Sequence, residues 1–416
     1  MSKYIINGKK PLRGSIKIHG AKNAVLPVLA ASVVSGRESL IHNCPELSDV
    51  TESLEILRVL GCRVKMDSGT VTVDSGNLIT NEVPGELMLK MRSSVIFLGA
   101  LIARCKSGRV TLPGGCEIGP RPIDLHLKAL RDMGIEIEDS GGIISCDARN
   151  MKSAHVHLEF PSVGATENVM LAATGARGIT KITNAAKEPE IVDLQKYLNA
   201  AGFRVSGAGT DTVYIEGATA GKSAEHTIIP DRIEAATYAS AILMTGGKAE
   251  LCDVCPEHMQ AFLSALKDCG AGIEIKNRNV LVEYKSRLKS VKHIRTQPYP
   301  GFPTDMQSVF MSLMTLSDGT SVITENIFKD RFRHVDGLVR MGADIVTDGN
   351  VAIIRAKKEL FGASVSAGDL RGGAALTIAA LAAEGKSTVD NLCYIDRGYE
   401  RFEENLGLLG ADIQRM

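Results

Sequence analysis

Apolar side chains recur at helical spacing in six stretches of the chain, and each stretch ends at a glycine. In the first stretch Val50, Leu54 and Leu57 fall on one face of a helix. The terminal glycines are Gly61, Gly134, Gly202, Gly270, Gly342 and Gly410. Four stretches are expected to begin with a proline, at Pro45, Pro122, Pro189 and Pro256. The period of about 70 residues is too long for a solenoid and predicts six copies of a small α/β module.

A second helix, apolar almost all round, is predicted ahead of each amphipathic one. These helices are expected at residues 24–35, 92–103, 165–176, 233–244, 305–316 and 370–383. A helix without a polar face is usually buried at the centre of a domain. After the glycines, alternating apolar and polar residues predict β-hairpins at 63–73, 135–146, 203–215 and 343–354.

The sixth module ends at residues 411–416 with a single strand, so a partner strand must come from elsewhere. Residues 4–8 have the required pattern, which places the two chain ends together. We therefore predict two domains of three modules each, residues 22–229 and residues 1–21 with 230–416, and expect a site in the cleft between them. A single large α/β sheet is the alternative.

Composition limits the classes of partner. The 416 residues contain 48 Lys and Arg against 48 Asp and Glu, with a pI near 7.1, which argues against a general nucleic-acid or membrane-surface binder. No apolar run reaches the length of a membrane span and the first residues lack a signal-peptide pattern, so a cytoplasmic protein is expected. The nine cysteines are interpreted as reduced thiols. Cys252 and Cys255 form a CxxC without a second pair, which gives little support to zinc or redox chemistry.

Polar and charged residues stand where the buried helices are expected to begin. They are Lys22 and Asn23, Arg92, Ser162 to Thr166, Arg232, Asp305 and Arg371. A helix N-terminus presents unpaired N–H groups and partial positive charge, so a cation there favours anion binding. The alternative is that each is an ordinary solvated helix end.

The segment GGCEIGPRPIDLHL, from Gly114 to Leu127, has the composition of a functional loop. Cys116 is five residues before Arg121, and a helix is expected to begin at Pro122. The charge of Arg121 and the dipole of this helix could both stabilise a Cys116 thiolate. The alternative is a buried, inert cysteine.

Two further clusters are candidates. The loop QPYPGFPTDM brings Asp305 to the start of a buried helix, where it could be a functional carboxylate or only an N-cap. The second cluster precedes the last two amphipathic helices and comprises Asp330 to Arg333, Asp396, Arg397 and Arg401, with Arg401 expected inside its helix. Its arginines could also be surface charges.

At these segments the sequence resembles the enolpyruvyl transferase family, in particular the members that act on UDP-N-acetylglucosamine. The most specific motifs are Gly20 to Ala24 (GAKNA), the Cys116 loop, Pro300 to Asp305 (PGFPTD), Asp330 to Phe332, Asp369 to Gly372 and Asp396 to Gly398. The resemblance runs essentially end to end. It implies a mixed α/β fold of two inside-out α/β barrel domains, each of three repeated units with buried central helices.

The resemblance also implies roles for individual residues. Lys22 and Asn23 would contact phosphoenolpyruvate, with Lys22, Arg121 and Arg397 around its phosphate. Arg331 and Arg371 would hold its carboxylate. The positions matching the UDP-N-acetylglucosamine site are Arg92, Arg121, Pro122, Ile123, Asp124, Leu125, Ser162, Val163, Gly164, Asp305 and Ile327. Lys329 and Phe160 depart from residues common in the family and are assigned no role.

The implied chemistry is addition followed by elimination. Cys116 would protonate the methylene carbon of phosphoenolpyruvate, Asp305 would take the proton of the attacking sugar hydroxyl, and a tetrahedral ketal would then lose phosphate. Lys22 and Arg397 would stabilise the phosphate, and neither a metal nor an organic cofactor is implied. The same thiol would react with the epoxide fosfomycin.

Three other functions are alternatives. A family member that uses shikimate 3-phosphate would lack the cysteine loop. A nucleic-acid clamp or RNA-end-processing relative is disfavoured by zero net charge and the lack of Trp. A regulatory relative without activity is opposed by intact Lys22, Cys116 and Asp305.

Overall fold

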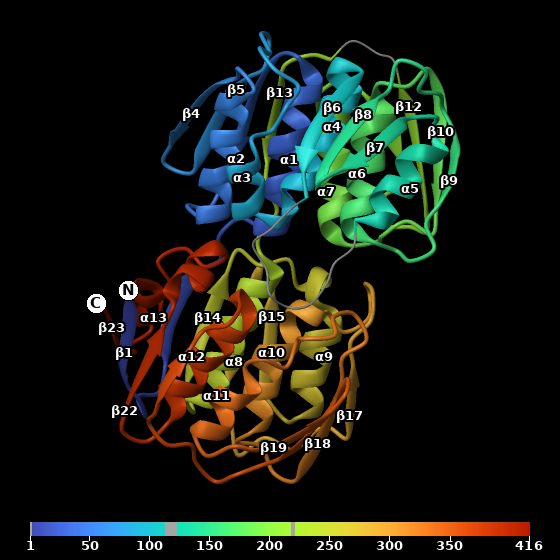
Figure 1. The fold of residues 1–416 in the computed structure, drawn as a ribbon. Coiled ribbons are helices and arrows are strands. Elements are labelled where there is room, and N and C mark those ends of the chain that lie inside the picture. The colour runs from blue at the N-terminus through green and yellow to red at the C-terminus, as the bar shows by residue number, and fades with distance from the viewer. Residues whose placement is uncertain (1, 113–122, 218–220) are drawn as a thin grey trace. The chain divides into compact units, whose positions relative to one another are not determined.

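The computed structural model describes residues 2–112, 123–217 and 221–416, except for the side chain of Arg92. The described chain divides into two compact units. The first unit lies between Gly20 and Ile229, and the second contains the residues up to His19 together with Pro230–Met416. The second unit is therefore built from both ends of the chain (Figure 1).

In the first unit, α1 (Lys22–Ser35), α4 (Ile96–Cys105) and α6 (Val163–Thr174) pack against one another. Their residues are almost all buried because none of the three has a polar face. Three sheets contain the strands of this unit, in the orders β13-β3-β5-β4, β6-β8-β7 and β11-β12-β10-β9. The strands are β3 (Glu38–His42), β4 (Arg63–Asp67), β5 (Thr70–Asp74), β6 (Ser107–Thr111), β7 (Glu136–Ser140), β8 (Ile143–Asp147), β9 (His155–His157), β10 (Gly178–Thr183), β11 (Arg204–Ser206), β12 (Thr212–Gly217) and β13 (Ala224–Thr227).

The second unit repeats this plan. Its central helices are α8 (Arg232–Met244), α10 (Thr304–Met314) and α12 (Leu370–Ala382), each in contact with the other two. The sheets have the orders β15-β16-β14-β2, β17-β18-β20-β19 and β21-β22-β1-β23. The strands are β1 (Lys3–Asn7), β2 (Arg13–Lys17), β14 (Lys248–Cys252), β15 (Gly272–Lys276), β16 (Asn279–Glu283), β17 (His293–Arg295), β18 (Thr320–Thr324), β19 (Asp344–Asp348), β20 (Val351–Arg355), β21 (Ser364–Ser366), β22 (Lys386–Asp390) and β23 (Asp412–Arg415).

The chain ends meet in one sheet, as predicted from the incomplete sixth module. β1 pairs antiparallel with both β22 and β23, and in Figure 1 this blue strand lies among red ones. The four predicted hairpins are confirmed as β4 with β5, β7 with β8, β11 with β12, and β19 with β20. The α/β class with buried central helices is confirmed, although the described strands form six separate sheets and no continuous barrel.

The six amphipathic helices end as predicted. They are α2 (Ser48–Val59), α5 (Asp124–Asp132), α7 (Pro189–Ala200), α9 (Gln260–Asp268), α11 (Val335–Arg340) and α13 (Phe402–Leu408). All six terminal glycines have positive φ, from 77° at Gly134 to 101° at Gly61. Glycine adopts this left-handed conformation without a Cβ penalty, which explains why the repeat shows so clearly in the sequence.

Several predicted helix starts were wrong. Pro189 does begin α7, but Pro45 lies three residues before α2, and Pro256 begins a separate 3-10 turn, η2 (Pro256–Met259), ahead of α9. Pro122 is outside the described residues. The second buried helix begins with the 3-10 turn η1 (Arg92–Val95), which follows the short helix α3 (Gly85–Lys90). Arg401 precedes α13 with a φ of 41° and is not inside the helix.

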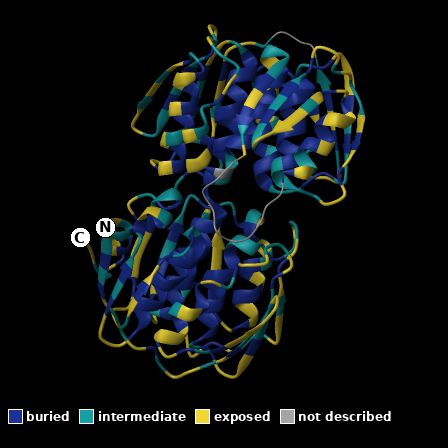
Figure 2. Cartoon of the chain, viewed as in Figure 1, coloured by how far each residue is buried: buried dark blue, intermediate teal, exposed yellow. Residues whose placement is uncertain are grey.

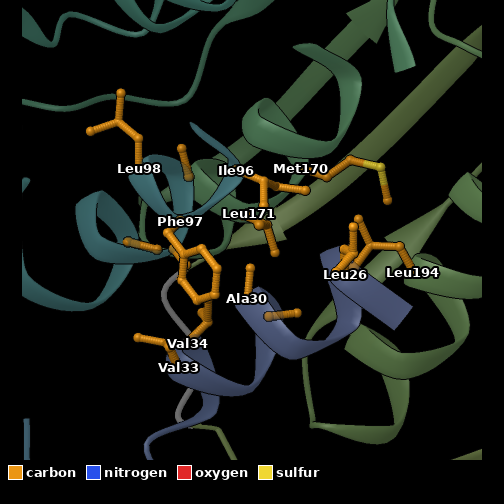
Figure 3. Packing of buried hydrophobic residues seen from close by; sticks show 14 of the residues in the cluster. Leu26, Ala30, Val33, Val34, Ile96, Phe97, Leu98, Met170, Leu171 and Leu194 are labelled. Atoms are coloured by element: carbon orange, nitrogen blue, oxygen red, sulfur yellow. The ribbon is translucent and has the colours of Figure 1, made fainter. Parts of the chain in front are cut away.

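The central helices supply much of the hydrophobic core of each unit. Figure 2 shows these helices as dark blue, buried ribbons with exposed residues toward the outside of each unit. In the first unit Phe97 of α4 packs beside Val33 and Val34 of α1 (Figure 3). None of the described helices is long and apolar enough to cross a bilayer.

Central helices approach so closely at Gly99 that a methyl group there is expected to destabilise the first unit. Its N–H donates to Asn168 Oδ1 at 2.8 Å, and an added Cβ would lie 2.5 Å from the Asn168 carbonyl oxygen. Gly99→Ala should therefore cost about 1–3 kcal/mol and lower the thermal unfolding midpoint of the unit. Gly407→Ala is the matched control, because its Cβ would meet nothing within 4 Å on α13 and should be neutral or stabilising. Calorimetry of the full chain compares them, and equal midpoints for the two variants would contradict the expectation.

Candidate functional site

In the second unit, Asp305 lies between two buried guanidinium groups at the start of α10. Arg331 Nη2 donates to its Oδ1 at 2.7 Å and Arg371 Nη2 to its Oδ2 at 3.3 Å. The side chains of the two arginines are only 2% and 3% exposed, whereas that of Asp305 is 26% exposed. The carboxylate is thus accessible at its surface side while the cations hold its orientation.

Arg371 stays charged despite its burial. Burial lowers the pKa of this guanidinium, but the Asp305 carboxylate, followed by the Tyr399 phenol, offsets that effect and the pKa is raised overall. Its guanidinium also lies over the Tyr399 ring, 5.6 Å from the centroid. The Tyr399 hydroxyl in turn lies 2.8 Å from Thr237 Oγ1 of α8, so Arg371 is tied to two central helices.

Glu325 connects the loop that leads to α10 with the loop that follows β18, and sequence reasoning missed it. Its side chain is buried and accepts hydrogen bonds from the hydroxyls of Thr296 and Thr304. It also accepts from the N–H groups of Ile327 and Phe328. A single glutamate after a strand gives no sequence signal for such a role, because Thr296 and Thr304 become its neighbours only in the fold.

Asp369 and His334 are two further buried polar residues near Arg371 and Arg331. Asp369 Oδ1 caps α12 by accepting from the N–H groups of Arg371 and Gly372 at 3.0 Å. Burial lowers the pKa of the His334 imidazole to about 4; Asp369 raises it and Arg331 lowers it further. A Cβ at Gly372 would lie 2.5 Å from Asp369 Oδ2 and 3.0 Å from His334 Cβ, which explains why glycine stands there.

The other candidates of the second unit lie at separate helix starts. Arg232 begins α8 beneath the Tyr299 ring, 5.5 Å from its centroid. Arg397 ends the 3-10 turn η3 (Leu392–Arg397) and is partly buried. The preceding Asp396 forms two hydrogen bonds with Arg415, at 2.8 and 2.6 Å, so it has a structural partner.

In the first unit, Lys22 begins α1 with its ammonium 2.8 Å from the Asp49 carboxylate of α2. Both side chains are at least nine-tenths buried, and Asn23 beside them is partly buried. Asp49 was not among the candidates, since a single acidic residue in a helix's first turn is a common dipole partner. The ion pair with Asp49 therefore holds the Lys22 ammonium in place.

Two candidate segments of the first unit lie next to each other. Residues 123–125 open α5 and residues 162–164 open α6, where Ser162 Oγ accepts from the Ala165 N–H. A Cβ at Gly164 would lie 2.9 Å from the His126 ring. His126 Nδ1 lies 2.7 Å from Asn168 Nδ2, so the two helix starts share a polar link that the sequence did not reveal.

Other candidates lie outside the described residues, namely Cys116, Arg121 and Pro122, as does the side chain of Arg92. None of the eight described cysteines is in a disulfide. Burial raises the pKa of the thiols of Cys44, Cys62, Cys146 and Cys269 to about 12. Cys393 is the one described cysteine that is exposed.

Comparison with known proteins identifies the family. Residues 6–406 match the family model of EPSP synthase (3-phosphoshikimate 1-carboxyvinyltransferase). The chain belongs to the EPSP synthase family of enolpyruvyl transferases. The resemblance seen in the motifs is thereby confirmed.

Relatives within the enolpyruvyl transferases match over the whole chain. UDP-N-acetylglucosamine 1-carboxyvinyltransferase 2 of Caldanaerobacter subterraneus is 50% identical over 416 residues, covering 100% of both chains. UDP-N-acetylglucosamine 1-carboxyvinyltransferase of Halothermothrix orenii is 46% identical over 416 residues, again with 100% of both covered.

Solved structures of enolpyruvyl transferases share the fold. The enolpyruvyl transferase NikO from Streptomyces tendae has a TM-score of 0.91 and 22% identity, with 100% of this chain and 99% of that one covered. EPSP synthase from Acinetobacter baumannii has a TM-score of 0.75 and 18% identity, with 100% of both covered.

The buried His334 predicts loss of stability in acid. Its folded pKa of about 4 is below the ordinary 6.5, so between these values the unfolded chain binds a proton that the folded chain does not. The contribution of His334 to the free energy of unfolding should therefore be fully present above pH 6.5. It should fall by about 1–3 kcal/mol as the pH drops toward 4.

Urea unfolding of the full chain between pH 7 and pH 4 measures this effect. His334→Gln should reduce the dependence on pH, whereas His293→Gln, at an exposed position of the same unit, should keep it. An unchanged pH dependence in His334→Gln would show that other groups cause it.

Proposed function

We propose that this enolpyruvyl transferase moves the enolpyruvyl group of phosphoenolpyruvate to the 3-hydroxyl of UDP-N-acetylglucosamine and releases phosphate. This is the first committed step of peptidoglycan synthesis. The observation that carries the proposal is the end-to-end identity, at 50% and 46%, with two relatives named for transfer to this acceptor. The Cys116 loop, which the shikimate 3-phosphate members lack, supports the same acceptor.

In the addition step, the Cys116 thiol gives its proton to the methylene carbon of phosphoenolpyruvate, which leaves C2 electron-poor. The 3-hydroxyl oxygen forms a bond to C2 while its proton passes to Asp305. The product is a tetrahedral ketal that still carries phosphate. The two guanidinium groups at 2.7 and 3.3 Å support this role, because they hold the Asp305 carboxylate in one orientation.

In the elimination step, the methyl group returns a proton to the Cys116 thiolate as the bond between C2 and the phosphate oxygen breaks, which restores the carbon double bond. The proton that Asp305 took from the hydroxyl leaves with the phosphate. Lys22, Arg121 and Arg397 stabilise the leaving phosphate. Lys22 is suited to this role since its ammonium is held by Asp49 at 2.8 Å and needs little reordering.

Substrate binding is proposed for the remaining candidates. Arg331 and Arg371 hold the phosphoenolpyruvate carboxylate, and Arg331 Nε and Arg371 Nη1 are buried donors without a hydrogen-bond partner among the described residues. Asn23 contacts the same substrate. The sugar nucleotide is bound by Arg92, Arg121 to Leu125, Ser162 to Gly164, Asp305 and Ile327.

Two further properties belong to the proposal. The Cys116 sulfur can form a bond to C2 of phosphoenolpyruvate once the methylene carbon has been protonated. It can also open the fosfomycin epoxide, where the new C–S bond replaces one C–O bond and the epoxide oxygen takes up a proton. A cytoplasmic location suits a nucleotide-sugar substrate and a set of thiols without disulfides among the described residues.

Phosphate release from phosphoenolpyruvate tests the acceptor and the acid together. Release is expected with UDP-N-acetylglucosamine and absent with shikimate 3-phosphate. Cys116→Ala should lose it, and Cys116→Asp should keep it while becoming insensitive to fosfomycin, since a carboxyl can donate a proton but does not form the thioether. Cys393→Ser, at the exposed control thiol, should behave as wild type. Release only with shikimate 3-phosphate would overturn the proposed acceptor, and release with neither would overturn the activity.

Removing the charge of Asp305 tests the proposed base. Asp305→Asn should lower kcat by about 10²–10⁴ because an amide cannot take the hydroxyl proton. Steady-state kinetics of the full chain measure the effect, with Asp348→Asn as the matched control at an exposed position of the same unit. A change in KM alone would contradict a role in proton transfer.

A further inference from the structure

The fourth module contains a cluster of three side chains of kinds that bind metal ions. None of the three has a role in the proposed reaction. The ligand atoms of Cys255, Glu257 and His258 all lie within 4.8 Å of one another. We propose that these residues form a site for one divalent ion of the zinc class. The proposal concerns binding alone, and does not depend on the proposed reaction.

The donor set selects the kind of ion. Thiolate, imidazole and carboxylate together suit Zn²⁺ and chemically similar ions, whereas Mg²⁺ and Ca²⁺ take oxygen ligands. Zinc bonds of about 2.0–2.3 Å place tetrahedral ligand atoms about 3.3–3.8 Å apart. The cluster spans at most 4.8 Å, so small side-chain rotations bring the three atoms to the distances that zinc requires.

The backbone holds these ligands on one short turn. Cys255 precedes η2, and its carbonyl accepts from the His258 N–H at 2.9 Å. The Tyr299 hydroxyl donates to the Glu257 carbonyl at 3.3 Å, which ties the turn to the loop that leads to α10. Three ligands within four residues on a braced turn need little ordering to bind an ion.

The surroundings favour an exchangeable ion. Cys255 and His258 are partly buried and Glu257 is exposed, so a water or another ligand can occupy the fourth position. Arg278 forms two hydrogen bonds with Asp253 and also lies near Cys255 and Glu257. A cation beside the ligands competes with a metal ion, which limits affinity.

The cluster differs from the CxxC considered in the sequence. Cys252, at the end of β14, is not one of the three ligands, and its pKa is raised by burial and then by Glu250. The metal set combines Cys255 with the two side chains that follow Pro256. The proposed site therefore needs no second cysteine pair.

Cobalt is the probe that reports the thiolate directly, because a Co²⁺–thiolate bond gives a charge-transfer absorption band. We would titrate the full chain carrying Cys116→Ala and Cys393→Ser, so that neither of these two thiols supplies the signal. The band is expected to saturate at one Co²⁺ per chain and to disappear when one equivalent of Zn²⁺ is added.

Variants within this background decide the assignment. Cys255→Ser should abolish the band, and His258→Gln should weaken binding at least tenfold while the thermal unfolding midpoint without metal stays the same. Cys252→Ser is the matched control and should retain both the band and the affinity. Absence of a stoichiometric band, its loss in Cys252→Ser, or equal affinity in His258→Gln would each overturn the proposal. If Cys255→Ser does not fold, His258→Gln and Glu257→Gln measured by zinc titration decide it by the same tenfold criterion.

Discussion

Burial of three apolar helices at the centre of each unit is the constraint on which the rest of the structure depends. α1, α4 and α6 in the first unit, and α8, α10 and α12 in the second, have no polar face to turn toward water. The sheets and amphipathic helices must therefore surround them. The charged side chains of the candidate site stand at the ends of the central helices, where the first N–H groups need acceptors.

The candidate site uses those ends in two ways. Asp231 and Asp369 cap α8 and α12 with their carboxylates, and an arginine stands in the first turn after each cap: Arg232 directly after Asp231, and Arg371 two residues after Asp369. The capping carboxylate accepts from the N–H groups of the helix, so each helix start combines a satisfied N-terminus with a cation. In the second unit the anion present is Asp305, and its two arginine partners are too deeply buried to be simple surface charges.

Much of this was predictable because it depends on local physical rules. The six terminal glycines all require a left-handed backbone, and the helices that are apolar all round could only be buried. The strand at the N-terminus was predictable because the last module lacked a partner. Helix starts were less predictable: Pro45 stands outside α2, and Arg401 takes a left-handed conformation before α13, since nearby polar groups and tertiary packing decide where the first turn forms.

The sequence by itself determined the modular α/β plan, the family and the residue types of the site, because these follow from periodicity and short motifs. The tertiary structure alone decided the partners. Glu325, His334 and Asp49 have no distinctive sequence context, yet burial makes their neighbours energetically important. Likewise, the structure groups Cys255 with Glu257 and His258 instead of Cys252, because side-chain direction on a turn, which spacing does not specify, brings ligand atoms together.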